Sequence, residues 1–294
     1  MRFKHLPHLR SFYSGSCILE FPSLKELWIE GCKELKTIFS TINAPTQHFF
    51  NKTVAFPSLE KLYVKGMDEL NNKWYTALPT KSFSKLRVLV VESCGKLLSF
   101  GPLNLLQRLE NLQELEISKC DSLEEVFKVE EEETSMKIRE KHEHTKREEE
   151  TTLVFHQLKI MRFKYLPYLR SFYSGSCILE FPSLKELRIE CCEKLETIFP
   201  TINGPTQHFF NEKVVFPVLE KLYLKSLFNL REIGIGSLPL HFIQTLEVRY
   251  CGNLRNLFSS SIATTLKRLE GRDWQWKKKK MMMHDNMQLR QLSR

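Results

Sequence analysis

The sequence lacks any long apolar run and lacks the short motifs that mark common enzyme families. No window of its 294 residues approaches the roughly 18 continuous apolar residues of a membrane span. It contains no G-x-x-x-x-G-K-S/T phosphate loop, no G-x-S-x-G turn, no H-E-x-x-H motif and no G-x-G-x-x-G loop. No spacing pairs two carboxylates for acid–base catalysis. These absences argue against a transmembrane protein and an enzyme, so we expect no catalytic residue, cofactor or metal.

The cysteines also lack the spacing of a disulfide framework or a metal site. The eight of them form no C-x-x-C pair, and no signal peptide opens the chain. His142 and His144 have no second ligand cluster at a defined spacing, so we assign them to a solvated loop. The glycosylation sequon at Asn51 is discounted because no secretion signal accompanies it. We expect a reducing compartment, the cytoplasm, with the nucleus as the alternative.

The net charge of +9 is unevenly distributed along the chain. Residues 128–150 hold nine Glu against six Lys and Arg, whereas residues 267–294 hold nine Lys and Arg against three acidic residues. A nucleic-acid-binding module usually concentrates its positive charge on the folded domain itself. Because much of the excess here lies in the tail, a nucleic-acid partner is disfavoured.

Internal repetition is the dominant feature of the sequence. Residues 1–65 align with residues 161–225 at an offset of 160, with 51 of 65 positions identical, so the chain contains a segmental duplication. A shorter frame, F-x-x-L-x-x-L-x-I-x-x-C-x-x-L, fills eight times, starting at residues 21, 56, 83, 109, 155, 181, 216 and 240, and a partial ninth copy opens the chain. Such a period is the signature of stacked coils that share one core.

Each L-x-I segment of the frame predicts a short strand with one buried face, because its apolar residues alternate. We expect parallel strands centred near residues 27–29, 62–64, 89–91, 115–117, 187–189, 222–224 and 246–248, with little helix between them. The cysteine position of the frame also holds Met67, Leu166 and Leu227, so it requires a buried hydrophobe. We therefore predict buried, unreactive thiols at Cys32, Cys94, Cys120, Cys192 and Cys251.

The frame resembles the leucine-rich repeat in its irregular, cysteine-containing plant form. The segment FPSLKELWIEGCKELKTIF, residues 21–39, is similar to the C-terminal repeats of plant NB-ARC leucine-rich-repeat disease-resistance proteins, especially the coiled-coil class. The resemblance covers roughly residues 1–270. It implies an α/β-type leucine-rich-repeat solenoid: a curved parallel β-sheet of short strands with mostly irregular or short helical convex connections. The nucleotide-binding part of that family is not in this sequence, which has no phosphate loop.

We divide the sequence into a repeat array and a tail. Residues 1–270 form about nine irregular repeats, with a charged disordered insertion at 128–150, and residues 271–294 form a basic tail without repeats. Met1 aligns with Met161 inside a repeat, so we expect the native unit to extend upstream or the start to be misassigned. For the Lys277 to Lys280 tail we favour a gene-model artefact over a contact with nucleic acid or membrane.

The outward strand positions are the candidate protein-binding residues, because substitutions between the two copies fall outside the inward frame. Trp28 has become Arg188, and residues 33, 34 and 36 reverse their charges at 193, 194 and 196. A contact surface and simple drift explain these changes about equally well. The candidate residues are Trp28, Glu30, Lys61, Tyr63, Lys65, Arg162, Lys164, Arg188, Glu190, Tyr223, Lys225 and Arg249.

The resemblance implies a non-enzymatic recognition module of plant defence. Its partner would be a pathogen effector, a guarded host protein or the protein's own upstream nucleotide-binding domain, which the repeats would hold inactive. The alternatives are a substrate adaptor of a ubiquitin ligase, for which no F-box-like helical module is visible, and a truncated gene product without activity.

Overall fold

The computed structural model describes residues 1–14, 19–37, 39–40, 50, 54–70, 82–102, 105, 109–128, 152–175, 177–198, 209–210, 214–233 and 242–255. These belong to one compact unit, Met1–Leu257. Three features of the sequence lie outside the described residues: the loop histidines at 142 and 144, the sequon at Asn51 and the tail at 271–294. Lys128, which we placed in the insertion, is the last residue of a strand.

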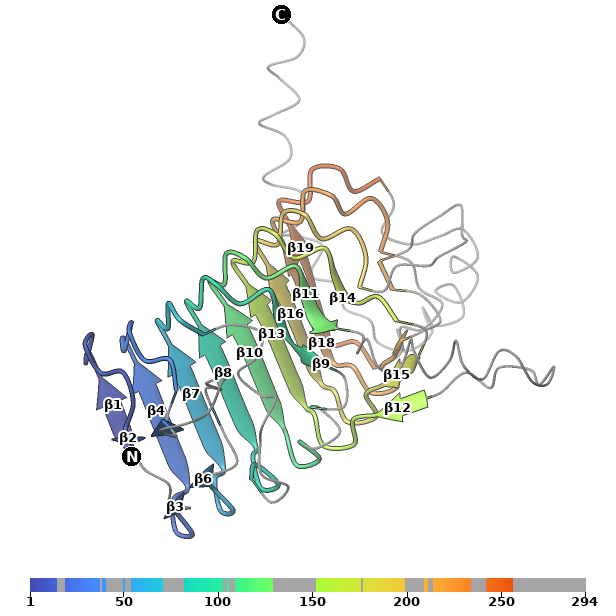
Figure 1. Ribbon diagram of the computed structural model, residues 1–294. Helices are drawn as coiled ribbons and strands as arrows, with labels where there is room; N and C mark the ends of the chain where they lie inside the picture. The colour runs from blue at the N-terminus through green and yellow to red at the C-terminus, as the bar shows by residue number, and fades with distance from the viewer. Residues whose placement is uncertain are drawn as a thin grey trace, which may run out of the picture. The chain divides into compact units, whose positions relative to one another are not determined.

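A nine-stranded parallel sheet organises the unit, and its strands pair in the order in which the chain forms them (Figure 1). Each predicted strand segment lies within one of them, and the leucine-rich-repeat fold is confirmed. Leu105 is the one helical residue among those described. The strands are β1 (Arg2–Lys4), β4 (Glu26–Glu30), β7 (Lys61–Lys65), β8 (Val88–Glu92), β10 (Glu114–Ser118), β13 (Ile160–Lys164), β16 (Glu186–Glu190), β18 (Lys221–Lys225) and β19 (Thr245–Arg249).

Short parallel strands also lie in the segments that connect the strands of the main sheet, where we expected irregular or short helical structure. Two three-stranded sheets and two two-stranded sheets are described in addition to the main one. They are β9 (Ser99–Pro102) with β11 (Glu125–Lys128) and β14 (Ser171–Tyr173), β12 (Thr152–Val154) with β15 (Ile178–Glu180) and β17 (Val214–Val215), β2 (Tyr13–Ser14) with β5 (Phe39–Ser40), and β3 (Leu19–Glu20) with β6 (Val54–Ala55).

The apolar positions of the frame build the core. Leu27, Ile29 and Leu35 are fully buried, as are their copies in the second half. Where two neighbouring coils both begin with phenylalanine, the two rings stack, with centroids 5.4 Å apart for Phe181 and Phe216. One coil could not bury these side chains alone, so the stacked coils stabilise one another.

The cysteine of the frame packs as an apolar side chain and also donates a weak hydrogen bond. Its thiol donates to the carbonyl oxygen of the last strand residue, with 3.4 Å between Cys120 Sγ and Ser118 O. Burial raises the pKa of the Cys192 thiol to about 12, which keeps it protonated. The prediction of burial is right for Cys32, Cys94, Cys120 and Cys192 but wrong for Cys251, which is half-buried and follows β19, the last strand of the main sheet among the described residues.

A residue with a left-handed backbone conformation follows every strand of the main sheet. The backbone φ at this position lies between 53° and 64° in all nine coils, and the residues are His5, Gly31, Gly66, Ser93, Lys119, Tyr165, Cys191, Ser226 and Tyr250. Glycine reaches this conformation at little cost, whereas other residues are strained by about 1–2 kcal/mol. Cys191 therefore occupies a strained position at which the first copy has Gly31.

Candidate protein-interaction surfaces

The twelve predicted contact residues all lie on strands of the main sheet, and their side chains alternate with the buried ones. The outer face of the sheet is therefore the first candidate surface, and its outward side chains form three rows, at the first, third and fifth residues of the five-residue strands. Its middle row follows the strand register through Arg2, Trp28, Tyr63, Val90, Glu116, Arg162, Arg188, Tyr223 and Glu247.

In the first copy the outer face is aromatic. The Trp28 and Tyr63 rings are stacked with centroids 3.8 Å apart and planes 15° from parallel. The Trp28 indole N–H donates to the carboxylate of Glu26. Arg2, Lys4 and Lys65 place cations 5.2–5.9 Å from the Trp28 ring centroid. The rings are half-buried by these neighbours, and burial raises the pKa of the Tyr63 hydroxyl.

In the second copy an ion-pair network occupies the same face. Arg162 is held by Glu114 at 2.5 Å and by Glu186 at 2.9 Å. Lys164 lies 3.0 Å from Glu116, whose other oxygen is 3.8 Å from Arg162. Arg162 is 23% exposed, so these charges are partly shielded from water. The Arg162 guanidinium is positioned by the protein's own carboxylates before any partner arrives.

Arg188 and Tyr223 take the place of the stacked aromatic pair. The Arg188 guanidinium carbon lies 3.9 Å from the Tyr223 ring centroid, and its Nη1 is 3.1 Å from Glu190. The scaffold therefore accepts either an aromatic ring or a guanidinium over the tyrosine. The two faces differ in chemistry although their strands are equivalent.

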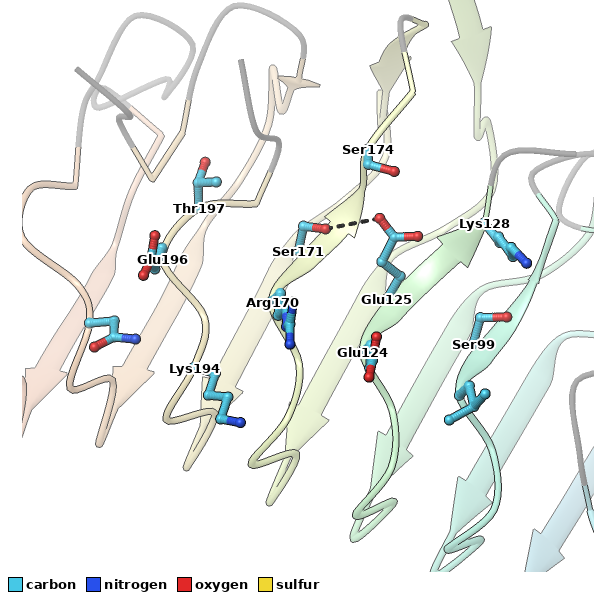
Figure 2. A pocket seen from close by; sticks show the side chains of 12 residues that line it. Ser99, Glu124, Glu125, Lys128, Arg170, Ser171, Ser174, Lys194, Glu196 and Thr197 are labelled. Atoms are coloured by element: carbon cyan, nitrogen blue, oxygen red, sulfur yellow. Dashed lines mark hydrogen bonds between the residues drawn. The ribbon is translucent and has the colours of Figure 1, made fainter. Parts of the chain in front are cut away.

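A groove on the flank of the coils is a second surface, which our sequence reasoning missed (Figure 2). It has a volume of about 910 Å³ and runs across five successive coils. Its residues flank the leucine that closes each frame, and they are Leu98, Ser99, Glu124, Glu125, Lys128, Arg170, Ser171, Ser174, Lys194, Glu196, Thr197 and Asn229. The signal that could have found it is the reversal of charge at residues 34 and 36 in the duplicate.

The comparisons with known proteins agree with this architecture. Residues 58–204 and 205–271 match the family described as plant disease resistance protein RPS2-like, leucine-rich repeats. The chain belongs to this family. It is 30% identical over 138 residues to a probable disease resistance protein of Arabidopsis thaliana. That alignment covers 47% of this chain and 13% of the relative, so the chain spans a small part of the curated relative's length. No solved structure matches the chain.

These disease-resistance repeats show no cluster of three potential metal-binding side chains within the part of the chain that the structure describes. Nor does any helix among the described residues have the length and apolar character needed to cross a membrane. What the described residues do present is a charged and aromatic sheet face and a polar groove beside it.

Proposed function

We propose that the chain is a non-enzymatic recognition module in plant defence, and that it binds a protein partner through the outer face of its main sheet. The observation that carries the proposal is the contrast between the Trp28–Tyr63 stack and the Arg188–Tyr223 stack on an otherwise repeated scaffold. Half-buried aromatic and arginine side chains are the types that dominate binding energy at protein interfaces. Membership of a disease-resistance family supports the same role.

The partner, in this proposal, is a pathogen effector, a guarded host protein or the nucleotide-binding domain of a longer resistance protein. The aligned segment makes up 13% of the Arabidopsis relative. We propose that a larger NB-ARC protein of the coiled-coil class carries the repeats. In such a protein the repeats would hold the nucleotide-binding domain inactive until the effector or host protein binds. We place this activity in the cytoplasm, in line with the free cysteines.

Site-specific photo-crosslinking tests the proposal. A benzophenone amino acid replaces Tyr63 or Tyr223 on the outer face, and in a control chain it replaces the exposed Val154 of β12, which lies outside the main sheet. In leaf tissue, the outer-face chains are expected to crosslink to a discrete protein that the control does not capture. Equal crosslinking by the control, or none from either outer-face position, would contradict recognition through this surface.

A further inference from the structure

The flank beside the main sheet has diverged between the two copies in a coordinated way. Three neighbouring positions change together: His8 becomes Tyr168, Glu34 becomes Lys194 and Lys36 becomes Glu196. The surrounding frame leucines are unchanged. The structure explains what these changes do, because His8 touches Glu34 and Tyr168 touches Lys194 across adjacent coils, and Lys36 or Glu196 lies two residues further along the second coil.

In the first copy, Glu34 on the flank pairs with two basic side chains of the preceding coil. Glu34 accepts from Arg10 Nε at 3.3 Å and lies 3.1 Å from His8 Nδ1. One carboxylate thus neutralises the arginine and contacts the histidine of the preceding coil.

In the second copy that partnership is lost. Arg170 corresponds to Arg10, but the position of its partner now holds Lys194, whose ammonium lies 3.9 Å from the Tyr168 ring centroid. No ion pair joins Arg170 to any described carboxylate. Among the described residues, the substitutions thus leave the arginine without an ion pair, and they add a tyrosine that is 48% exposed.

The remaining charges of the groove are likewise unpaired among the described residues. Glu124, Glu196 and Lys128 take part in no ion pair there, whereas Arg162 on the outer face contacts three carboxylates. Glu125 accepts a hydrogen bond from Ser171 at 3.3 Å, the bond drawn in Figure 2. Unpaired charges that line a recess are available to a ligand in a way that internally paired charges are not.

We propose that this groove is a second binding surface, bordered by Tyr168 and Phe228, and that it takes an extended segment of a partner protein in which an acidic side chain lies between two basic ones. Phe228 is 48% exposed and precedes Asn229 of the groove. Charge complementarity identifies the segment, since Glu124, Arg170 and Glu196 occupy equivalent positions on three successive coils.

The spacing of the coils sets the spacing within the segment. Neighbouring strands stand roughly 4.8 Å apart, so Glu124 and Glu196, two coils apart, lie on the order of 10 Å from each other. An extended chain rises about 3.3 Å per residue and places every second side chain on the same face, so three such side chains span roughly 13 Å, a difference that long Lys and Arg side chains can bridge. The segment therefore has a Lys or Arg, an Asp or Glu facing Arg170 and a second Lys or Arg at alternate positions, with an apolar side chain against Tyr168.

Panning the 294-residue chain with a phage-displayed library of random 12-residue peptides tests the proposal. Selected peptides are synthesised and their affinities measured for the wild type and for the triple variant Tyr168→His, Lys194→Glu and Glu196→Lys. This variant carries the residues of the first copy at the same backbone positions, so the array is expected to fold. Arg170→Gln is a milder second variant, and Trp28→Arg is the matched control on the outer face.

We expect the selected peptides to share a basic-x-acidic-x-basic pattern, because alternate side chains of an extended chain share one face. The triple variant should bind them at least tenfold more weakly and Arg170→Gln several-fold more weakly, while Trp28→Arg binds them as the wild type does. Affinity should also fall with added salt. Failure to enrich any peptide, enrichment of peptides without the pattern, or equal binding by folded Arg170→Gln would overturn the proposal. None of these results bears on recognition through the outer face, which Trp28→Arg probes separately.

Discussion

The two copies within this chain share a core and differ on their surfaces. Leu27, Ile29, Leu35 and their counterparts are fully buried in both, and the one inward difference, Val64 against Leu224, is conservative. On the outer face an aromatic stack in one copy corresponds to a cation–π stack in the other. On the flank, the Arg10–Glu34 ion pair of one copy corresponds in the other to an arginine that pairs with no described carboxylate. The comparison teaches that packing constrains the frame, whereas the surfaces between frame positions are free to change chemistry.

The largest expected effect tests whether the two cores are equivalent. Leu35→Ala and Leu195→Ala each remove a fully buried side chain and should each lower the free energy of unfolding by about 2–5 kcal/mol through a cavity. Denaturant unfolding of the two variants measures this. A cost in one copy several times that in the other would show that the duplicated cores are not packed alike.

The ion-pair network should distinguish the copies more clearly. Arg162→Met leaves Glu114, Glu116 and Glu186 without their shared cation and should destabilise the fold by about 1–3 kcal/mol. The corresponding Arg2→Met is the control, because Arg2 is 64% exposed at the sheet edge and should cost under about 0.5 kcal/mol. Equal costs in thermal or denaturant unfolding would contradict a structural role for the Arg162 network.

Substitutions at the left-handed position should change the free energy of unfolding by a smaller amount, and in opposite directions in the two copies. Cys191→Gly should stabilise the fold by about 0.5–1 kcal/mol, because glycine relieves the strain at a φ of 55°. Gly31→Cys should destabilise it by a similar amount. Melting temperatures of both variants measure the difference, and shifts in the same direction would rule out the conformational explanation.

Protonation of Glu92 should give the smallest effect. Hydrogen bonds from Lys119 and Lys65, each 2.8 Å long, lower the pKa of Glu92 in the folded state. Its contribution is therefore complete above the unfolded-state pKa and is lost as the pH falls through the lower folded-state value. Glu92→Gln should cost about 1 kcal/mol or less at neutral pH and nothing once the wild-type carboxylate is protonated. Unfolding curves recorded across the acid range measure this cost. If the ion pairs contribute nothing, the cost of Glu92→Gln will be the same at every pH.

The sequence predicted the fold well because the frame is a packing pattern. The alternation Leu27-x-Ile29 and its repeats located the strands, and the Met and Leu alternatives at the cysteine position indicated burial. Cys251 was mispredicted because the frame is the same in every coil and does not record which coil comes last in the described part of the sheet. The left-handed position was also missed, since His, Ser, Lys, Tyr and Cys occupy it as well as Gly.

The surfaces were predictable only in part. Alternation placed Trp28 and Tyr63 on one face, but their stacking depends on rotamers and on the register between coils. The Arg162 network joins residues up to 48 positions apart, a separation that no local pattern records. The groove was missed because its residues flank the last leucine of each frame and extend into the connecting segments, which were expected to be irregular.

Reciprocal exchange of the stacked residues tests the central claim, that a constant scaffold carries diversified contact surfaces. The affinity of a partner captured by the outer face is measured for the wild type, Trp28→Arg and Arg188→Trp, with melting temperatures recorded for each. Loss of an aromatic anchor at a true hot spot is worth roughly 2 kcal/mol or more, about thirtyfold in affinity. We expect Trp28→Arg to lose binding on that scale with its melting temperature little changed, because the side chain lies on the outer face. Unchanged affinity in both folded variants would contradict the claim and leave drift as the explanation of the differences between the copies.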